Sequence, residues 1–311
     1  MDNTTLMWVG FIAIVSVMLA LDLGVFNRKA HEPTFRESLF WSIVWVSIAI
    51  AFNVGVYFML GPQAGIEFAT GYVIEKALSV DNIFIFVMLF TYFQVPLMYQ
   101  HRVLFWGVIG AIIMRGILIA VGAALLAKFH WIIYVFGALL LFTGAKVAFQ
   151  KHEEKNPEGN PVIRFLRRFI PVTTEHHGQK FFVRQKGADG RLATFATPLF
   201  MVLVLVELSD LVFAVDSVPA IFAVTTDPFI VLSSNVFAIL GLRSLFFLLA
   251  GIVHKFHLLK MGLSLILVFV GAKMMLLDVF KIPVLASLVV VAAILVGSVV
   301  LSLVFPKNDK H

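Results

Sequence analysis

Three carboxylates interrupt an apolar stretch that is long enough to cross a membrane. Residues 206–220 read V-E-L-S-D-L-V-F-A-V-D-S-V-P-A and lie within an apolar run from 194 to 226. A charged side chain at the centre of a bilayer costs about 2.5–3.5 kcal/mol on insertion scales, so it is rarely kept without a use. This stretch predicts a membrane protein that holds acids inside its helix bundle. The acids are Glu207, Asp210 and Asp216.

The composition supports this interpretation. The chain has 311 residues, of which 60% are hydrophobic and 14% are charged, as is typical of a polytopic all-α membrane protein. Its net charge of +6 comes from bases between the apolar runs, which indicates membrane topology and no nucleic-acid partner. The sequence contains no phosphate-binding loop and no nucleophile elbow, so we expect no enzymatic activity and no cofactor.

Nine apolar runs are each long enough to be a transmembrane helix, because about 20 helical residues cross the hydrocarbon. With the N-terminus outside, 16 of the 24 Lys and Arg residues fall in cytoplasmic segments, against two on the opposite side. Segments rich in Lys and Arg stay in the cytoplasm, so we expect an external N-terminus and a cytoplasmic C-terminus. The runs are roughly 8–26, 40–60, 68–93, 103–127, 131–149, 195–224, 229–253, 258–280 and 283–305.

One long polar connection, 150–194, separates the fifth run from the sixth. After Pro161 it reads V-I-R-F-L-R-R-F-I, which favours a basic amphipathic helix on the inner membrane surface. Further on, F-F-V-R-Q and R-L-A-T-F flank a Gly-containing turn and predict a β-hairpin. His176 and His177 could bind a metal, although adjacent histidines in a solvated loop are more often simply polar residues.

A second acidic motif, E-K-A-L-S-V-D-N-I at 75–83, has the same acid spacing as 210–216. In both copies an Arg follows in the next helix and Gly-Ala-Lys follows in the third. Because each unit has three spans, the second unit starts on the opposite side, which predicts the inverted repeat of secondary transporters. The shared residues are Glu75, Asp81, Arg115 and Lys146 in the first unit, and Asp210, Asp216, Arg243 and Lys273 in the second.

This repeat predicts the domain organisation. Two N-terminal helices (1–66) precede the first three-helix unit (67–149), and the cytoplasmic loop (150–194) joins it to the second unit (195–280). A last helix and a tail (281–311) complete the chain.

Carboxylates beside amides and hydroxyls form an all-oxygen environment, which suits Mn²⁺, Ca²⁺ or Mg²⁺ better than copper or zinc. Two acids six residues apart lie about 120° apart on a regular helix, so they could share an ion only if the helix unwinds. Pro219 favours such a break in the second copy. The expected metal ligands are Glu75, Asp81, Asn82, Glu207, Asp210, Asp216 and Ser217, with Asp22 as a possible accessory acid.

Five bases also lie inside the spans. Because Arg and Lys repel a metal cation, we expect them to support the acids as ion pairs and not to bind the ion. The alternative is that all the charges form salt bridges that hold the bundle together. Buried ion pairs add little net stability, which favours a binding site for the acids. The bases are Lys76, Arg115, Lys146, Arg243 and Lys273.

The motifs E-K-A-L-S-V-D-N-I-F and V-E-L-S-D-L-V-F-A-V-D-S-V-P-A-I-F-A-V-T-T-D-P-F-I-V resemble those of the TerC family of integral membrane proteins, in its Alx-like branch. The resemblance extends over the whole length of the chain. It implies a cation exporter of the LysE type in the bacterial inner membrane, with Mn²⁺ as the transported ion. It also implies that the motif acids at 75, 81, 207, 210 and 216 bind that ion.

We therefore expect a divalent-cation exporter that works by alternating access between the two units, with the cation and the lipid bilayer as its partners. One alternative is a calcium or proton-coupled cation exchanger. Another is an accessory protein that supplies metal to secreted proteins. An intramembrane aspartyl protease is disfavoured because the sequence lacks G-x-G-D. The sequence does not reveal the oligomeric state.

Overall fold

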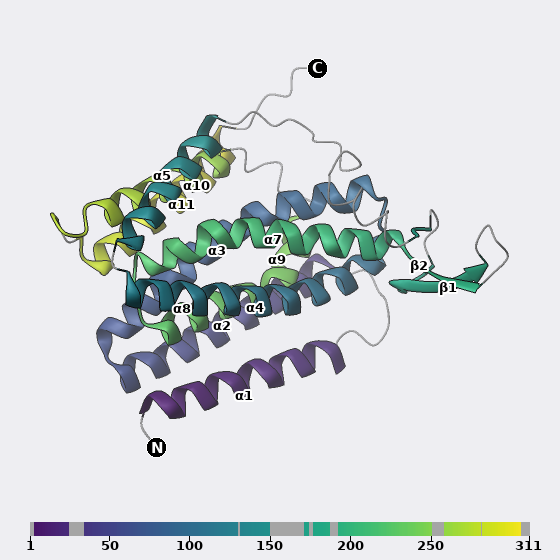
Figure 1. The fold of residues 1–311 in the computed structure, drawn as a ribbon, viewed down its shortest axis with the longest axis horizontal. Helices are drawn as coiled ribbons and strands as arrows, with labels where there is room; N and C mark the ends of the chain where they lie inside the picture. The colour runs from purple at the N-terminus through teal and green to yellow at the C-terminus, as the bar shows by residue number, and fades with distance from the viewer. Residues whose placement is uncertain are drawn as a thin grey trace.

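The computed structural model describes residues 3–24, 34–129, 131–149, 171–173, 177–186, 192–250, 258–280 and 282–305. This part of the chain is mostly helical, which confirms the predicted all-α class (Figure 1). One two-stranded sheet accompanies the helices. The elements are α1 (Asn3–Gly24), α2 (Phe35–Leu60), α3 (Pro62–Tyr92), α4 (Leu97–Lys128), α5 (Ile132–Phe149), β1 (Phe182–Lys186), β2 (Leu192–Ala196), α7 (Pro198–Phe222), α8 (Pro228–Leu240), α9 (Leu242–Leu249), α10 (Leu259–Met275) and α11 (Val284–Val304).

Six helical segments in the described part of the chain are long and apolar enough to cross a membrane. These are α2, α4, α5, α7, the α8–α9 segment and α11. The other three predicted spans fall short by this measure. The apolar part of α1 is only Thr5–Ala20, α10 has 17 residues, and α3 carries several charges along its 31 residues. The protein is a polytopic helical membrane protein, while the number nine stays a prediction.

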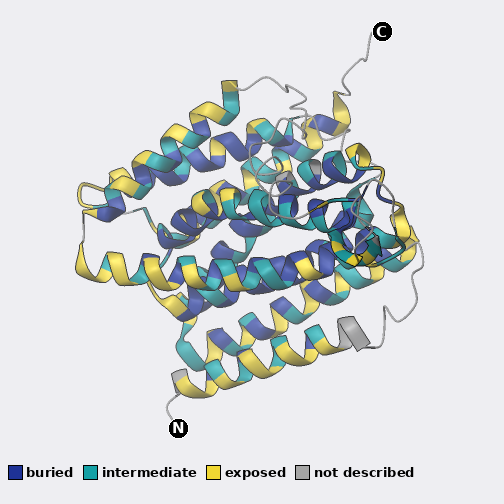
Figure 2. Ribbon diagram, turned by 45° about the vertical axis from the view of Figure 1, so that its right-hand side comes forward, coloured by how far each residue is buried: buried dark blue, intermediate teal, exposed yellow. Residues whose placement is uncertain are grey.

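The outside of the bundle is apolar, as a lipid-facing surface should be. Phe58 of α2 is 79% exposed and Phe142 of α5 is 67% exposed, although both are large and hydrophobic. Exposed residues follow the outer faces of the helices, and buried residues follow the inner faces (Figure 2). Contiguous exposed apolar surface of this kind marks a membrane or protein contact.

Short, defined breaks separate the helices. Gly61 alone lies between α2 and α3, and its φ of 101° is a conformation that glycine adopts without a steric penalty. Pro62 then begins α3, at a position where its missing N–H costs no helical hydrogen bond. At α8, Asp227 is the N-cap and accepts a hydrogen bond from the Phe229 backbone N–H at 2.8 Å.

The predicted unwinding at Pro219 does not occur. Helix α7 continues through Pro219 to Phe222, and the Pro219 carbonyl still accepts a hydrogen bond from the Ala223 N–H at 3.0 Å. Proline removes only its own N–H donor, which the Val215 carbonyl would otherwise accept, and this single loss does not interrupt α7. The break in the second half lies instead at Gly241, between α8 and α9.

Matching helices of the two acidic units lie beside each other and run in opposite directions. Gly71 near the start of α3 lies against Ile221 near the end of α7, while Asn82 farther along α3 bonds to Asp210. Helices α5 and α10 form a second antiparallel pair, since Gly137 lies against Gly271. Farther along α5, Gly144 lies against Val268 and its carbonyl accepts from Ser264. Figure 1 shows this pair with α11 at one side of the bundle.

The hairpin predicted within 150–194 is confirmed. Strands β1 and β2 pair antiparallel, with Phe182 opposite Ala196 and Lys186 opposite Leu192. The hairpin projects from the start of α7 (Figure 1). His177 is described and precedes β1. The expected amphipathic helix after Pro161 and the possible ligand His176 lie outside the described residues.

Candidate functional site

Arg115 of α4 lies at the centre of the bundle between two acids from the two acidic motifs. Its Nε and Nη2 groups donate to the Asp210 carboxylate at 3.0 and 2.8 Å, and Nη1 donates to Glu75. The exposed fractions of Arg115, Glu75 and Asp210 are 1%, 0% and 3%. A bidentate pair of this kind fixes the orientation of both groups, because the planar guanidinium matches the carboxylate.

Three polar side chains complete what we call the central cluster. Ser217 and Asn235 each offer an oxygen to Arg115 Nη1, at 3.1 and 3.3 Å. Asn235 also donates to Glu75 at 3.2 Å, and Asn82 donates to Asp210 at 3.3 Å. Helices α3, α4, α7 and α8 supply the cluster, whose members are Glu75, Asn82, Arg115, Asp210, Ser217 and Asn235.

The central cluster carries an excess of negative charge. Two carboxylates face one guanidinium, so the six side chains sum to one negative formal charge when all three groups are ionised. At a separation of 4 Å and an effective dielectric of 20, two unit charges interact by about 4 kcal/mol, which makes each charge in such a cluster significant. All its side chains are buried, so solvent screening is weak. Chemically, this arrangement favours cations.

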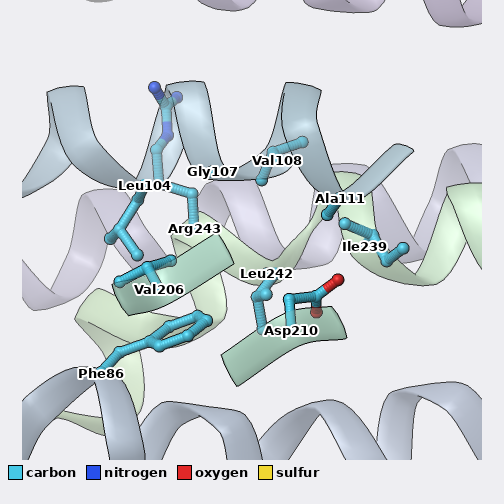
Figure 3. Close-up of a pocket in the computed structure, with 10 residues that line it drawn as sticks. All are labelled: Phe86, Leu104, Gly107, Val108, Ala111, Val206, Asp210, Ile239, Leu242 and Arg243. Atoms are coloured by element: carbon cyan, nitrogen blue, oxygen red, sulfur yellow. The ribbon is translucent and has the colours of Figure 1, made fainter. Parts of the chain in front are cut away.

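A small cavity of about 10 Å³ borders the cluster. Gly107, Val108 and Ala111 of α4 line one wall, and Asp210 and Arg243 also reach it (Figure 3). Figure 3 shows the Arg243 guanidinium directed away from the Asp210 carboxylate. A cavity of this size holds about one water molecule. It therefore leaves space for about one water molecule beside Asp210 and no room for a hydrated ion.

Two of the predicted ligands on α7 are not among the hydrogen-bond partners of Arg115, although one of them, Glu207, interacts electrostatically with Asp210. Asp216 accepts a hydrogen bond from Thr143 of α5 at 3.0 Å, and Lys146 is near enough to interact with it electrostatically. Glu207 packs over Gly110 of α4, and its Oε2 atom is buried with no hydrogen-bond partner among the described residues. The acids of the second motif thus have three different environments.

The remaining predicted bases have different partners. Lys76 donates to the Ala238 carbonyl at 2.9 Å and lies 5.9 Å from the centre of the Tyr72 ring. Lys273 is buried on α10 and interacts with Glu67 near the start of α3. The side chains of Asp22 and Asp81 lie outside the described part of the chain, so their predicted roles stay predictions.

Among the side chains that the structure describes, no three acids or histidines converge into a metal-binding group. Four of the predicted oxygen ligands lie close together, but Arg115 lies between the two acids among them; the four are Glu75, Asn82, Asp210 and Ser217. The sequence analysis did not select Asn235, which contacts both Arg115 and Glu75. The signal was present, because Ser233, Ser234 and Asn235 form a fully buried polar triplet within an apolar helix.

The comparisons with known proteins agree with this architecture. The profile described as the integral membrane protein TerC family matches residues 60–310. An uncharacterized membrane protein of Myxococcus xanthus, STKORF319, is 56% identical over 298 residues, which cover 96% of this chain and 92% of the relative. A candidate membrane-bound redox modulator of Escherichia coli strain K12, named Alx, is 49% identical over 310 residues, covering 96% and 95%.

A membrane protein of Rickettsia bellii is 40% identical over 297 residues, which cover 96% of this chain and 97% of the relative. No solved structure matches the chain. The family profile covers α3 to α11 and so includes every helix that supplies the central cluster. This chain therefore belongs to the TerC family of integral membrane proteins.

Proposed function

We propose that this protein exports divalent metal cations, with Mn²⁺ as the leading substrate, by alternating access between two inverted three-helix units. The observation that carries the proposal is the central cluster. Its buried acids, Glu75 and Asp210, come from the two motifs and face each other across Arg115. Ionisable residues inside a membrane are costly, and where they occur they mark substrate or ion pathways and other functional sites.

The contacts of the cluster support an inverted repeat. Aligning Asp81 with Asp216 places Glu75 on Asp210 and Asn82 on Ser217. Exchanging the two units therefore turns the pair Asn82 and Asp210 into the pair Ser217 and Glu75. The first pair is joined by a hydrogen bond, and the second pair is close because both residues accept from Arg115 Nη1. The antiparallel pairs α3 with α7 and α5 with α10 have the orientation that such a repeat requires. In this design the substrate site lies at the midplane, between the two halves.

The oxygen chemistry of the site supports a hard divalent cation. Carboxylate, amide and hydroxyl oxygens are ligands that Mn²⁺, Ca²⁺ and Mg²⁺ accept. No thiolate is available, since the sequence contains no Cys. For the same reason, a redox function of the kind suggested by the Alx relative's name could not use thiol exchange by this chain's own residues.

Transport of Mn²⁺, Ca²⁺, Mg²⁺ and Zn²⁺ into inverted membrane vesicles tests the proposal directly. Vesicles that contain the protein should accumulate Mn²⁺ faster than vesicles that lack it. Faster uptake of Ca²⁺ with dissipation of a proton gradient would favour the calcium or proton-coupled exchanger instead. No uptake of any of the four ions would exclude export and favour the accessory role in supplying metal to secreted proteins.

Site variants connect the transport to the central cluster. Glu75→Gln and Asp210→Asn should remove uptake while the protein still inserts, because losing a charge lowers the cost of insertion. Asp227→Asn is the matched control, since Asn serves equally well as the α8 N-cap and lies outside the cluster. Uptake by the two cluster variants at the control's rate, with equal protein in the membrane, would contradict the assigned site.

The orientation is part of the same proposal. We place the protein in the bacterial inner membrane with an external N-terminus, so that the hairpin and the C-terminus lie in the cytoplasm. The distribution of Lys and Arg between the loops supports this orientation.

A further inference from the structure

We propose that Arg115 is a built-in counter-ion which occupies the cation site and must leave it when the transported ion enters. The inference rests on the proposed function, because it assigns a role to Arg115 within the same site. It goes beyond a supporting ion pair, in which Arg115 and the ion would be bound together. In this scheme the guanidinium and the metal ion alternate on the same oxygens.

The hydrogen bonds of Arg115 support this exchange. The guanidinium contacts both oxygens of Asp210, one oxygen of Glu75, the Ser217 hydroxyl and the Asn235 amide oxygen. These are the oxygens that a hard divalent cation would use as ligands. An arginine that only supported the site would contact the outer side of the carboxylates and leave their inner oxygens for the ion.

Charge also opposes simultaneous occupancy. Among the described members of the cluster, the two carboxylates balance a divalent cation fully when Arg115 is absent. With Arg115 still in place, the same cation would leave one excess positive charge on these six side chains, which only an acid outside the cluster, such as Glu207 beside Asp210, could balance. Like charges at contact distance in a buried environment repel strongly. The cluster therefore accommodates either the guanidinium or the ion.

The second arginine of the repeat does not have this position. Arg243, which aligns with Arg115, reaches the cavity wall and directs its guanidinium away from Asp210 (Figure 3). Arg115 itself bridges acids from both motifs.

The test compares Mn²⁺ binding with Mn²⁺ transport for Arg115→Ala in the full chain, reconstituted in lipid nanodiscs and in vesicles. Suppose that Arg115 occupies the site in all but one molecule in ten, or fewer. Removing the guanidinium then lowers the apparent Kd for Mn²⁺ by about tenfold or more, because every molecule has a free site. The transport rate should nevertheless fall, because no internal cation remains to displace the bound ion. Guanidinium ion at millimolar concentration should restore weaker Mn²⁺ binding to this variant.

Lys128→Ala is the matched control, since it removes an exposed cation from the end of the same helix. It should leave the Kd for Mn²⁺ unchanged. If Arg115→Ala does not fold, Arg115→Lys decides the question, because Lys keeps the charge but lacks the planar fork that holds both acids. Its Kd for Mn²⁺ should also be lower than that of the parent.

The outcomes separate this inference from the proposed function. Mn²⁺ binding by the parent, with equal or weaker binding by the folded Arg115 variants, would overturn the exchange and leave the export function intact. Absence of Mn²⁺ binding and transport in the parent would overturn the proposed function itself. Tighter binding together with slower transport is a combination that a purely structural role for Arg115 does not produce.

Discussion

Replacing Asp210 with Asn tests how strongly the central cluster is coupled. In the native structure, Oδ1 of Asp210 accepts from Arg115 Nη2 at 2.8 Å and from Asn82 at 3.3 Å, while Oδ2 accepts from Arg115 Nε at 3.0 Å. An amide has only one acceptor oxygen, so its NH₂ group must face at least one of these donors. Removing one member of a buried ion pair costs about 3–5 kcal/mol. We expect Asp210→Asn to lower the free energy of unfolding by that amount.

Equilibrium unfolding of the full chain in mixed micelles, followed by fluorescence of its five Trp residues, measures this loss. The single variant Arg115→Gln should lose a similar amount. The double variant should lose about 1–3 kcal/mol less than the two losses added together, because Arg115→Gln alone leaves two unpaired acids whereas the double variant leaves only Glu75. A loss below about 0.5 kcal/mol for Asp210→Asn, or strict additivity in the double variant, would refute the argument.

Three further predictions concern other parts of the molecule. Gly271→Ala should lower the free energy of unfolding by about 1–3 kcal/mol, because its Cβ would lie 2.9 Å from the Gly137 carbonyl oxygen. The control Gly55→Ala, whose Cβ meets nothing within 4 Å, should not lower it, and equal effects of the two variants would contradict the packing. Glu207→Gln should leave the free energy of unfolding unchanged or raise it, because a neutral amide replaces a buried acid that has an unpartnered oxygen. A marked loss of stability would reveal a partner for the charge. Reporter fusions should place the β-hairpin and the C-terminus on the cytoplasmic side, and an external hairpin would exclude the inverted repeat.

The sequence predicted the helices well, because a run of about 20 apolar residues allows few alternatives in a membrane. The predicted run 131–149 corresponds to α5 at Ile132–Phe149, and the run 283–305 corresponds to α11 at Val284–Val304. The hairpin was also predictable, since two strand-like segments flank a Gly-containing turn. These features depend on local sequence alone.

The geometry of the site was less predictable, because it depends on how helices far apart in sequence approach each other. The sequence predicted that the buried bases pair with the buried acids, but not which base meets which acid. In the structure Arg115 pairs with Glu75 and Asp210, whereas Lys76 donates to a backbone carbonyl. The break at Gly241 was missed in favour of Pro219, because proline removes a helical hydrogen bond and so predicts a break, whereas α7 continues through it. Asn235 was missed because amides carry no charge and so attract less attention in an apolar run.

The close approach of α5 and α10 also limits how the protein can move. Gly137 and Gly271 bring two backbones together, and Ser264 of α10 donates to the Gly144 carbonyl at 2.7 Å. At these positions the two helices pack closely, so they have little freedom to slide past each other. If the protein works by the proposed alternating access, we expect a rocking motion with this helix pair as the pivot and the largest displacements at the ends of α3 and α7 farthest from it. Cross-links between α5 and α10 should then permit turnover that cross-links between α3 and α7 would arrest.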